Sequence, residues 1–342
     1  MPPALPDFRT RVTPGQSAKT FAFPADFQRI VPPMATLKLL TTPDHPDGSH
    51  RIGSPGGYEF WHFHAEDQSR RLRVAVSFHD GFALHPDYIR RYAAYRRNPT
   101  RNAPPTPSQY PCLQINVFEN KKILASSTTY LTPGSLHTED PQSLALGSSR
   151  AIFRESEIAL AISESQLALS VKLTFEPILV LTPIEKSFPP AGAGEHHWIP
   201  ARPLCQVHGQ IRRSGRTIPF TGLGQHNHYY GTGPLSAVAG RWIRGCVLFP
   251  RAAEIFQAVA RHAIAVTASK SGIQVSENPS FTAEWNHRFL RPPSHPITMN
   301  FGDRLILRNP RLASVIGPQL QIVYDAYVEG VQGTAWVEID HP

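Results

Sequence analysis

The stretch from Gly222 to Gly231 holds two histidines, an amide pair and two phenols among glycines, and reads Gly-Leu-Gly-Gln-His-Asn-His-Tyr-Tyr-Gly. On an extended strand His226 and His228 lie two apart, so both imidazoles point to one face, while Asn227 and Tyr229 point to the other. Such a face suits a proton donor, a metal or a polar ligand. The alternative is a glycine-rich strand end whose histidines make structural hydrogen bonds.

The composition favours an all-β protein with two compact units. The chain has 342 residues, which exceeds the roughly 150 residues typical of one domain. Its 34 prolines and 23 glycines predict many turns and few long helices. The formal charge of +8 permits anionic partners but does not choose among them.

The chain divides by composition into three parts. Residues 1–50 form a proline-rich segment with a possible first strand at Thr36–Leu40, and residues 51–188 and 195–342 form the two domains. The linker between these domains is expected at Ser187–Gly194, which is rich in proline, alanine and glycine. Residues 83–110 contain five prolines and are expected to form a long loop.

Alternating apolar residues predict successive antiparallel hairpins. The clearest pairs join 58–64 to 71–78 and 113–118 to 122–125, and a further strand is expected at 281–285. Two units of this kind would close as antiparallel β-barrels or sandwiches, which leave no exposed edges and hold one small apolar ligand.

Arginines and tyrosines alternate in the run from Arg90 to Arg101. Such a run could bind nucleic acid, but no nucleic-acid motif accompanies it, so we expect a solvated loop or short helix and no nucleic-acid partner. The same run would suit a peripheral contact with a membrane surface. Three cysteines without CxxC spacing, no signal-peptide pattern and no long apolar run predict a cytoplasmic protein.

Four landmarks resemble, in order and spacing, the carotenoid 1,2-hydratase (hydroxyneurosporene synthase) and AttH-like group. They are Tyr58–Ala65, His197–Pro200, Gly222–Gly231 and Arg241–Gly245. Fungal Diels-Alderase-like cyclases look like relatives on the same scaffold. The resemblance implies two lipocalin-like β-domains packed together, with an apolar pocket near their interface.

The resemblance further implies cofactor-independent hydration of a C=C bond in an extended apolar isoprenoid or polyene. Three departures from the family pattern weaken the case for hydration. Gln225 and Asn227 stand where the family has Tyr and Asp, and Tyr230 stands where the hydratases have a tryptophan. Around residues 252–258 the family's aspartate is missing, and Glu254 is the nearest carboxylate.

Hydration of an alkene requires an acid, aromatic faces that stabilise a carbocation, and a positioned water. A carboxylic acid in an apolar pocket can stay protonated, because burial raises its pKa. The candidate catalytic residues are His226, His228, Tyr230, Glu59 and Glu254. The candidate substrate-binding residues are Trp61, Trp198, Gln225, Asn227, Tyr229 and Trp242.

Other interpretations of these residues stay open. Glu59 is at least as well explained as a buried structural carboxylate, and the three tryptophans as barrel core. A Diels-Alderase-type cyclase needs only a shaped cavity with hydrogen-bond donors, and a non-catalytic carrier needs only the cavity.

Histidine pairs also raise the question of a metal. His62 and His64, His196 and His197, and His226 and His228 form three such pairs. No carboxylate or cysteine sits at ligand spacing beside them, and the resembling family is not known for a metal. We therefore expect neither a metal nor another cofactor, and a hydrophobic small molecule as the partner.

Overall fold

A computed structural model describes most of the chain from residue 36 onward. The described residues are 36–39, 46–69, 71–120, 122–139, 142–179, 185–188, 194–234, 242–259, 262–277, 297–301, 303–316, 319–328 and 331–340. The predicted strand at 281–285 lies outside them.

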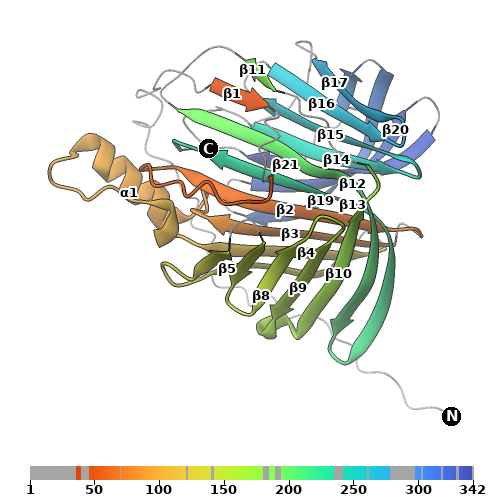
Figure 1. The fold of residues 1–342 in the computed structure, drawn as a ribbon, viewed down its shortest axis with the longest axis horizontal. Helices are drawn as coiled ribbons and strands as arrows, with labels where there is room; N and C mark the ends of the chain where they lie inside the picture. Colours follow the sequence, from red (N-terminus) through yellow and green to blue (C-terminus); the bar gives the residue numbers. More distant parts are fainter. Residues whose placement is uncertain are drawn as a thin grey trace, which may run out of the picture. The chain divides into compact units, whose positions relative to one another are not determined.

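The first sheet is large and mostly antiparallel, and it curls into a half-barrel (Figure 1). Its strands run in the order β5-β4-β3-β2-β13-β12-β10-β9-β8-β7-β6, and β1 pairs with β11 and β12. The strand bounds are β1 Thr36–Leu39, β2 Tyr58–Asp67, β3 Leu72–Asp80, β4 Cys112–Glu119, β5 Lys122–Tyr130, β6 Leu136–Glu139, β7 Ser143–Leu146, β8 Ser149–Phe153, β9 Ile158–Glu164, β10 Leu169–Pro177, β11 Lys186–Phe188, β12 Glu195–Arg213 and β13 Arg216–Gly231.

The second sheet is antiparallel in the order β17-β16-β15-β14-β21-β20-β19-β18. Two four-stranded meanders form it, and they join where β14 pairs with β21. Its strands are β14 Trp242–Phe249, β15 Ala252–Val259, β16 His262–Ser269, β17 Gly272–Glu277, β18 Ile297–Phe301, β19 Asp303–Ile316, β20 Gln319–Val328 and β21 Val331–Asp340. The all-β prediction and both predicted hairpins are confirmed.

One helix corrects the long loop expected at residues 83–110. Helix α1 covers Pro86–Arg97, and two single-turn 3-10 helices lie at Pro107–Gln109 and Ser165–Leu167. The side chain of His85 accepts a hydrogen bond from the backbone N–H of Asp87, and Pro86 occupies the first helical turn, where its missing N–H costs nothing. Proline therefore starts a helix here, although its abundance had suggested a loop.

The change from the first to the second sheet lies between Gly231 and Trp242. The expected linker at 187–194 instead precedes β12, which pairs with β10 and β13 inside the first sheet. Residues 195–231 thus belong to the sheet built by the residues before them. The division into domains at 188 and 195 stays a prediction.

Strands β2 and β13 pair with each other along ten residues and are buried on both faces. Their inner face joins the apolar core of the half-barrel, which includes Trp61 and Phe63. Their outer face packs against the second sheet in a separate core that includes Phe60, Tyr229 and Trp242. Polar side chains at these strands are therefore enclosed whichever way they point.

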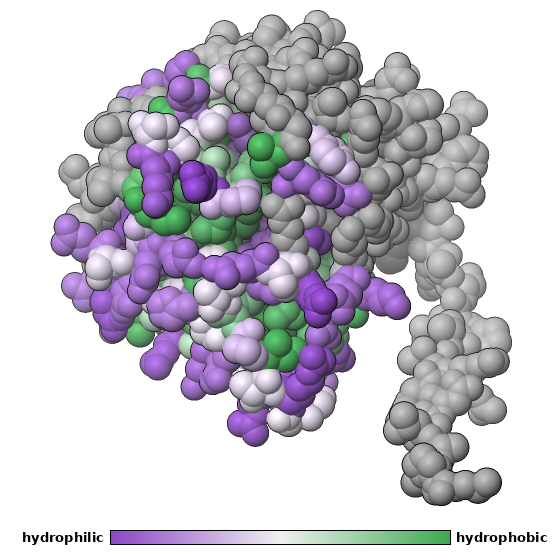
Figure 2. Space-filling view, turned by 90° about the vertical axis from the view of Figure 1, so that its right-hand side faces the viewer, coloured by the Kyte–Doolittle hydropathy of each residue, from purple (hydrophilic) through white to green (hydrophobic). Residues whose placement is uncertain are grey.

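Side chains at the described surface are mostly hydrophilic on the face that Figure 2 shows, with hydrophobic residues visible in gaps between them. Within the described part of the chain, no helix has the length and apolar content needed to cross a bilayer.

Candidate functional site

The polar side chains of strand β13 lie in two separate places, one on each face of the sheet. The imidazoles of His226 and His228 lie on the inner face, where they meet the segment Pro46–His50. Gln225, Asn227 and Tyr229 point the other way, into a small cavity between the two sheets. The predicted alternation is confirmed, and it divides the candidate residues between two sites.

His228 is fixed by both of its ring nitrogens. Its Nδ1 lies 2.9 Å from the carbonyl oxygen of Pro46, which can only accept, so Nδ1 carries a proton. Its Nε2 lies 2.9 Å from Oε1 of Glu59, and the ring stacks on Trp61 with centroids 4.6 Å apart. Because the carboxylate also only accepts, this second contact is a hydrogen bond only when Nε2 carries another proton.

Glu59 is fully buried and surrounded by donors. Oε1 accepts from the backbone N–H of His50 at 2.8 Å and lies 3.0 Å from its Nδ1, while Oε2 accepts from Ser49 Oγ at 3.1 Å. Burial by itself raises the pKa of Glu59, but hydrogen bonds from His228 and His50 outweigh it and lower the pKa to about 2. Glu59 is therefore ionised at neutral pH, whereas a proton-donating Glu59 required a raised pKa.

His226, two residues earlier, also lies between a backbone carbonyl and a carboxylate. Its Nδ1 lies 3.1 Å from the carbonyl oxygen of His62, and its Nε2 lies 3.1 Å from Oδ1 of Asp47. Arg202 approaches the other oxygen of Asp47 at 3.2 Å. Burial raises the pKa of Asp47, but His226 and Arg202 more than offset this and the net shift is downward.

The segment Pro46–His50, here called the strap, supplies partners to both histidines. Trp61 holds it by donating from Nε1 to the carbonyl oxygen of Asp47 at 2.9 Å. These residues lie in the predicted proline-rich segment 1–50, and neither Asp47 nor His50 was among the candidate residues. The run Asp44-His45-Pro46-Asp47-Gly48-Ser49-His50, dense in acids and histidines just before a strand, was the available signal.

Tyr230 lies at the outer edge of this group. Its ring stacks between His50, with centroids 3.8 Å apart, and His197, with centroids 4.1 Å apart. His197 in turn lies 2.9 Å from Glu195. His50 is 24% exposed, so the group that contains the buried Glu59 reaches solvent through His50.

A second carboxyl group lies opposite Glu59 on the neighbouring strand β3. Asp80 is the register partner of Glu59 on β3, so both side chains share the inner face. Burial, and then the negative charge of Glu59, raise the pKa of Asp80 to about 7. Asp80 was not a candidate from the sequence, because the shift of its pKa depends on burial and on that cross-strand neighbour.

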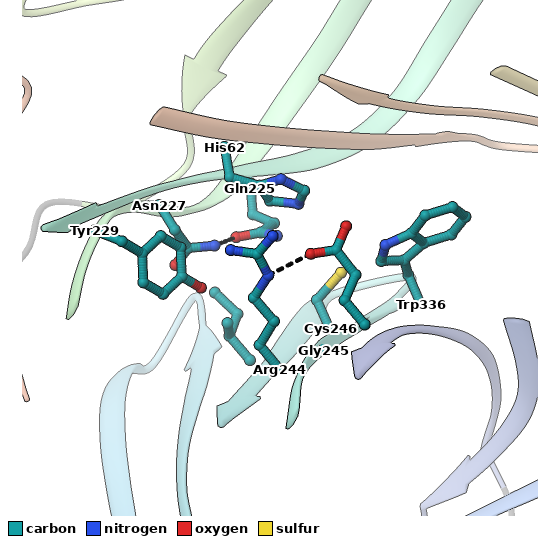
Figure 3. Close-up of a pocket in the computed structure, with 10 residues that line it drawn as sticks. His62, Gln225, Asn227, Tyr229, Arg244, Gly245, Cys246 and Trp336 are labelled. Atoms are coloured by element: carbon teal, nitrogen blue, oxygen red, sulfur yellow. Dashed lines mark hydrogen bonds and ion pairs between the residues drawn. The ribbon is translucent and has the colours of Figure 1, made fainter. Parts of the chain in front are cut away.

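The cavity between the sheets contains charged and amide side chains, where the resemblance implied an apolar pocket. Arg244 forms an ion pair with Glu338 inside it (Figure 3). The guanidinium also lies over the rings of Phe60 at 4.6 Å and Trp242 at 4.7 Å. About 10 Å³ is open to the centre of a water molecule, which is room for one water. The residues that line the cavity are His62, Gln225, Asn227, Tyr229, Arg244, Gly245, Cys246, Ile255, Trp336 and Glu338.

The remaining candidates take structural positions. Trp198 is fully buried and donates to Asn227 Oδ1 at 3.0 Å, and Trp242 donates to Gln257 at 3.1 Å. Glu254 accepts from Thr267 at 3.0 Å. Its register partner is Val247, one residue out of phase with the cavity-lining Cys246, so Glu254 points to the other face of the second sheet. The structure does not bring Glu254 to the histidines of β13.

Among the described residues, the side chains close enough together to hold a metal ion are not the histidine pairs noted in the sequence. Ligand atoms of His50, Glu59 and His228 lie within 4.8 Å of one another. The close contacts of both imidazoles with Oε1 are also accounted for by hydrogen bonds, in which a shared proton takes the place that an ion would occupy.

Comparison with known proteins supports the resemblance. A hydroxyneurosporene dehydrogenase of Chlorobaculum tepidum is 24% identical over 226 residues, which make up 60% of this chain and 57% of that protein. An AttH-like protein of Nitrosomonas europaea superposes with a TM-score of 0.61, covering 88% of this chain and 97% of that one at 12% identity. This chain has an AttH-like fold. The match spans just over half the length of the dehydrogenase, and no family model matches the chain.

A kievitone hydratase of Nectria haematococca also aligns, over 90% of this chain and 97% of its own, with 9% identity and a TM-score of 0.49. The superposition on the AttH-like protein confirms, at the level of fold, the resemblance inferred from the four landmarks.

Proposed function

We propose that this protein is a hydratase-like enzyme that adds water to a C=C bond of an extended apolar polyene, with the proton supplied by the inner-face group His228, Glu59 and His50. The observation that supports this most is the contact between His228 and Glu59. Both side chains are fully buried, and the imidazole is held by a backbone carbonyl on one side and a carboxylate on the other.

The acid in this group is an imidazolium rather than the carboxylic acid expected from the sequence. Glu59 stays ionised, so the proton that the His228 contact requires resides on Nε2 of the imidazole. Glu59 then holds and orients the proton, as carboxylates do for catalytic histidines elsewhere. His50 touches the same carboxylate oxygen and is the partly exposed member, which makes it the route by which a proton reaches substrate or solvent.

The reaction would proceed in two steps. A proton passes from the group to one alkene carbon, the π electrons form the new C–H bond, and the neighbouring carbon becomes a cation. Water attacks this cation and returns a proton to the group, so the net change is the addition of one water. The ring of Trp61 lies against His228 and would stabilise the positive charge through cation–π attraction. Both faces of the Tyr230 ring are already covered, by His50 and by His197.

The substrate class rests on the relatives. The name of the Chlorobaculum protein refers to hydroxyneurosporene, which supports a polyene of that kind. The first experiment looks for a natural ligand: purified protein is extracted, and the extract is analysed by mass spectrometry. The protein is then incubated with the extracted compound, or with a set of isoprenoid polyenes, in heavy-oxygen water.

A product that gains one labelled water supports hydration. Glu59→Gln and His228→Gln should each lower the rate by about 100-fold or more, which is typical of the loss of a general acid or its partner. His208→Gln is the matched control, since His208 is exposed and faces Glu176 at 3.9 Å on the surface. Water addition at the wild-type rate in both variants would show that His228 and Glu59 do not supply the proton. A product of unchanged mass would indicate cyclisation, and an unchanged bound ligand would indicate a carrier.

A further inference from the structure

Helix α1 and the turn after it carry a dense positive charge. Five arginines are exposed between Pro86 and Arg101, and Asp87 is the one acidic residue in that stretch. Five arginines and one aspartate give the stretch a formal charge of +4. Asp87 accepts a hydrogen bond from Arg90 at 2.9 Å. The exposed arginines are Arg90, Arg91, Arg96, Arg97 and Arg101.

The tyrosines of the helix face the protein. Tyr88, Tyr92 and Tyr95 are spaced i, i+4 and i+7, which places them on one side. Tyr88 is 2% exposed, donates to the carbonyl oxygen of Gly57 at 2.6 Å and stacks on Tyr110 with centroids 4.4 Å apart. The helix is therefore anchored by its tyrosine side, and its arginines are left to solvent.

The anchoring point lies beside the inner-face group. A Cβ atom placed on Gly56 would lie 2.6 Å from the ring of Tyr92 and 2.9 Å from Pro234. Gly56 lies two residues before β2, the strand that carries Glu59, and Pro234 lies three residues after β13, which ends at Gly231. In Figure 1, α1 accordingly lies at the starting end of β2. The basic helix and the partly exposed His50 thus belong to the same end of this strand pair.

We propose that α1 docks this protein on a bilayer surface that contains anionic phospholipid, through its exposed arginines. This goes beyond the proposed function and does not depend on it. Each basic side chain near such a surface strengthens binding about fivefold. A single-stranded nucleic acid would need exposed aromatic rings for base stacking, and the side of α1 that carries the tyrosines is turned inward.

Co-sedimentation of the full chain with large vesicles tests this proposal. We expect binding to vesicles of phosphatidylcholine mixed with phosphatidylserine, little binding to phosphatidylcholine alone, and loss of binding as salt rises, because salt screens exposed charges. The triple variant R91Q/R96Q/R97Q should bind the mixed vesicles on the order of 100-fold more weakly. The charge-preserving variant R91K/R96K/R97K should bind within a few-fold of wild type.

A matched control removes three arginines elsewhere. R212Q/R213Q/R216Q strips the hairpin between β12 and β13 of the same charge, and should leave vesicle binding within a few-fold of wild type. Equal losses in the two glutamine variants would overturn the proposal, since net charge rather than α1 would then drive binding. So would equal binding to both vesicle types, or tighter binding to single-stranded RNA that the α1 variant abolishes. Circular dichroism and thermal melting confirm that each variant is folded.

Discussion

Replacing Glu59 by glutamine should remove a pH-dependent part of the protein's stability. The folded state lowers the pKa of Glu59 from 4.5 to about 2, which corresponds to about 3 kcal/mol of stability at neutral pH. Because the folded pKa is the lower one, this contribution is complete above pH 4.5 and is lost as the pH falls toward 2. By pH 3 roughly 2 kcal/mol of it has gone.

Urea unfolding of wild type and Glu59→Gln between pH 7 and pH 3 measures this contribution. The variant should be less stable by about 3 kcal/mol at pH 7, and the gap should shrink to about 1 kcal/mol at pH 3. Glutamine keeps an oxygen that can accept from the backbone N–H of His50, so the substitution removes charge more than shape. Glu155→Gln, at an exposed position, should show no gap at either pH. A gap for Glu59→Gln that is constant across this range would refute the ionised, histidine-bound carboxylate.

Two further predictions concern residues close to the same strands. The pKa of Asp80 is raised to about 7 in the folded state, so its ionisation opposes folding as the pH rises from 3.8 to about 7. Asp80→Asn should therefore stabilise the protein at pH 8 and not at pH 4, and thermal melts that show no such difference would contradict the shift. A Cβ on Gly222 would lie 2.0 Å from the carbonyl oxygen of Glu66, whereas one on Gly233 would meet nothing within 4 Å. Gly222→Ala should cost about 1–3 kcal/mol in urea unfolding and Gly233→Ala under 1 kcal/mol, and equal costs would count against the close pairing of β13 with β2.

Helix α1 shows how a correct local signal was outweighed by composition. Pro86 at the first helical position, Asp87 in the first turn and Arg97 in the last turn are all helix-favouring features. The tyrosines also repeat with helical spacing. The short helix that was one expectation for the run from Arg90 to Arg101 is therefore confirmed, whereas the long loop expected from the prolines is wrong over Pro86–Arg97, because proline at a helix start is compatible with the helix.

The site was predictable only as far as a single strand reaches. Period-two geometry is local, so the separation of His226 and His228 from Asn227 and Tyr229 follows from the sequence alone. The state of Glu59 does not, because it depends on His228, 169 positions away, and on the strap before β2. Burial and hydrogen bonding shift a pKa in opposite directions here, and only the folded arrangement sets which one prevails.

The sequence by itself determined the β-rich class, the hairpins and the two-sided strand that carries the histidines, because these depend on the alternation of neighbouring residues. The tertiary structure decided that β12 and β13 complete the first sheet, that the strap supplies Asp47 and His50, and that Glu254 lies on another face. The pairing of β13 with β2 and the contact of His228 with Glu59 join segments more than a hundred residues apart. Their selection depends on packing across the whole fold, which no local pattern records.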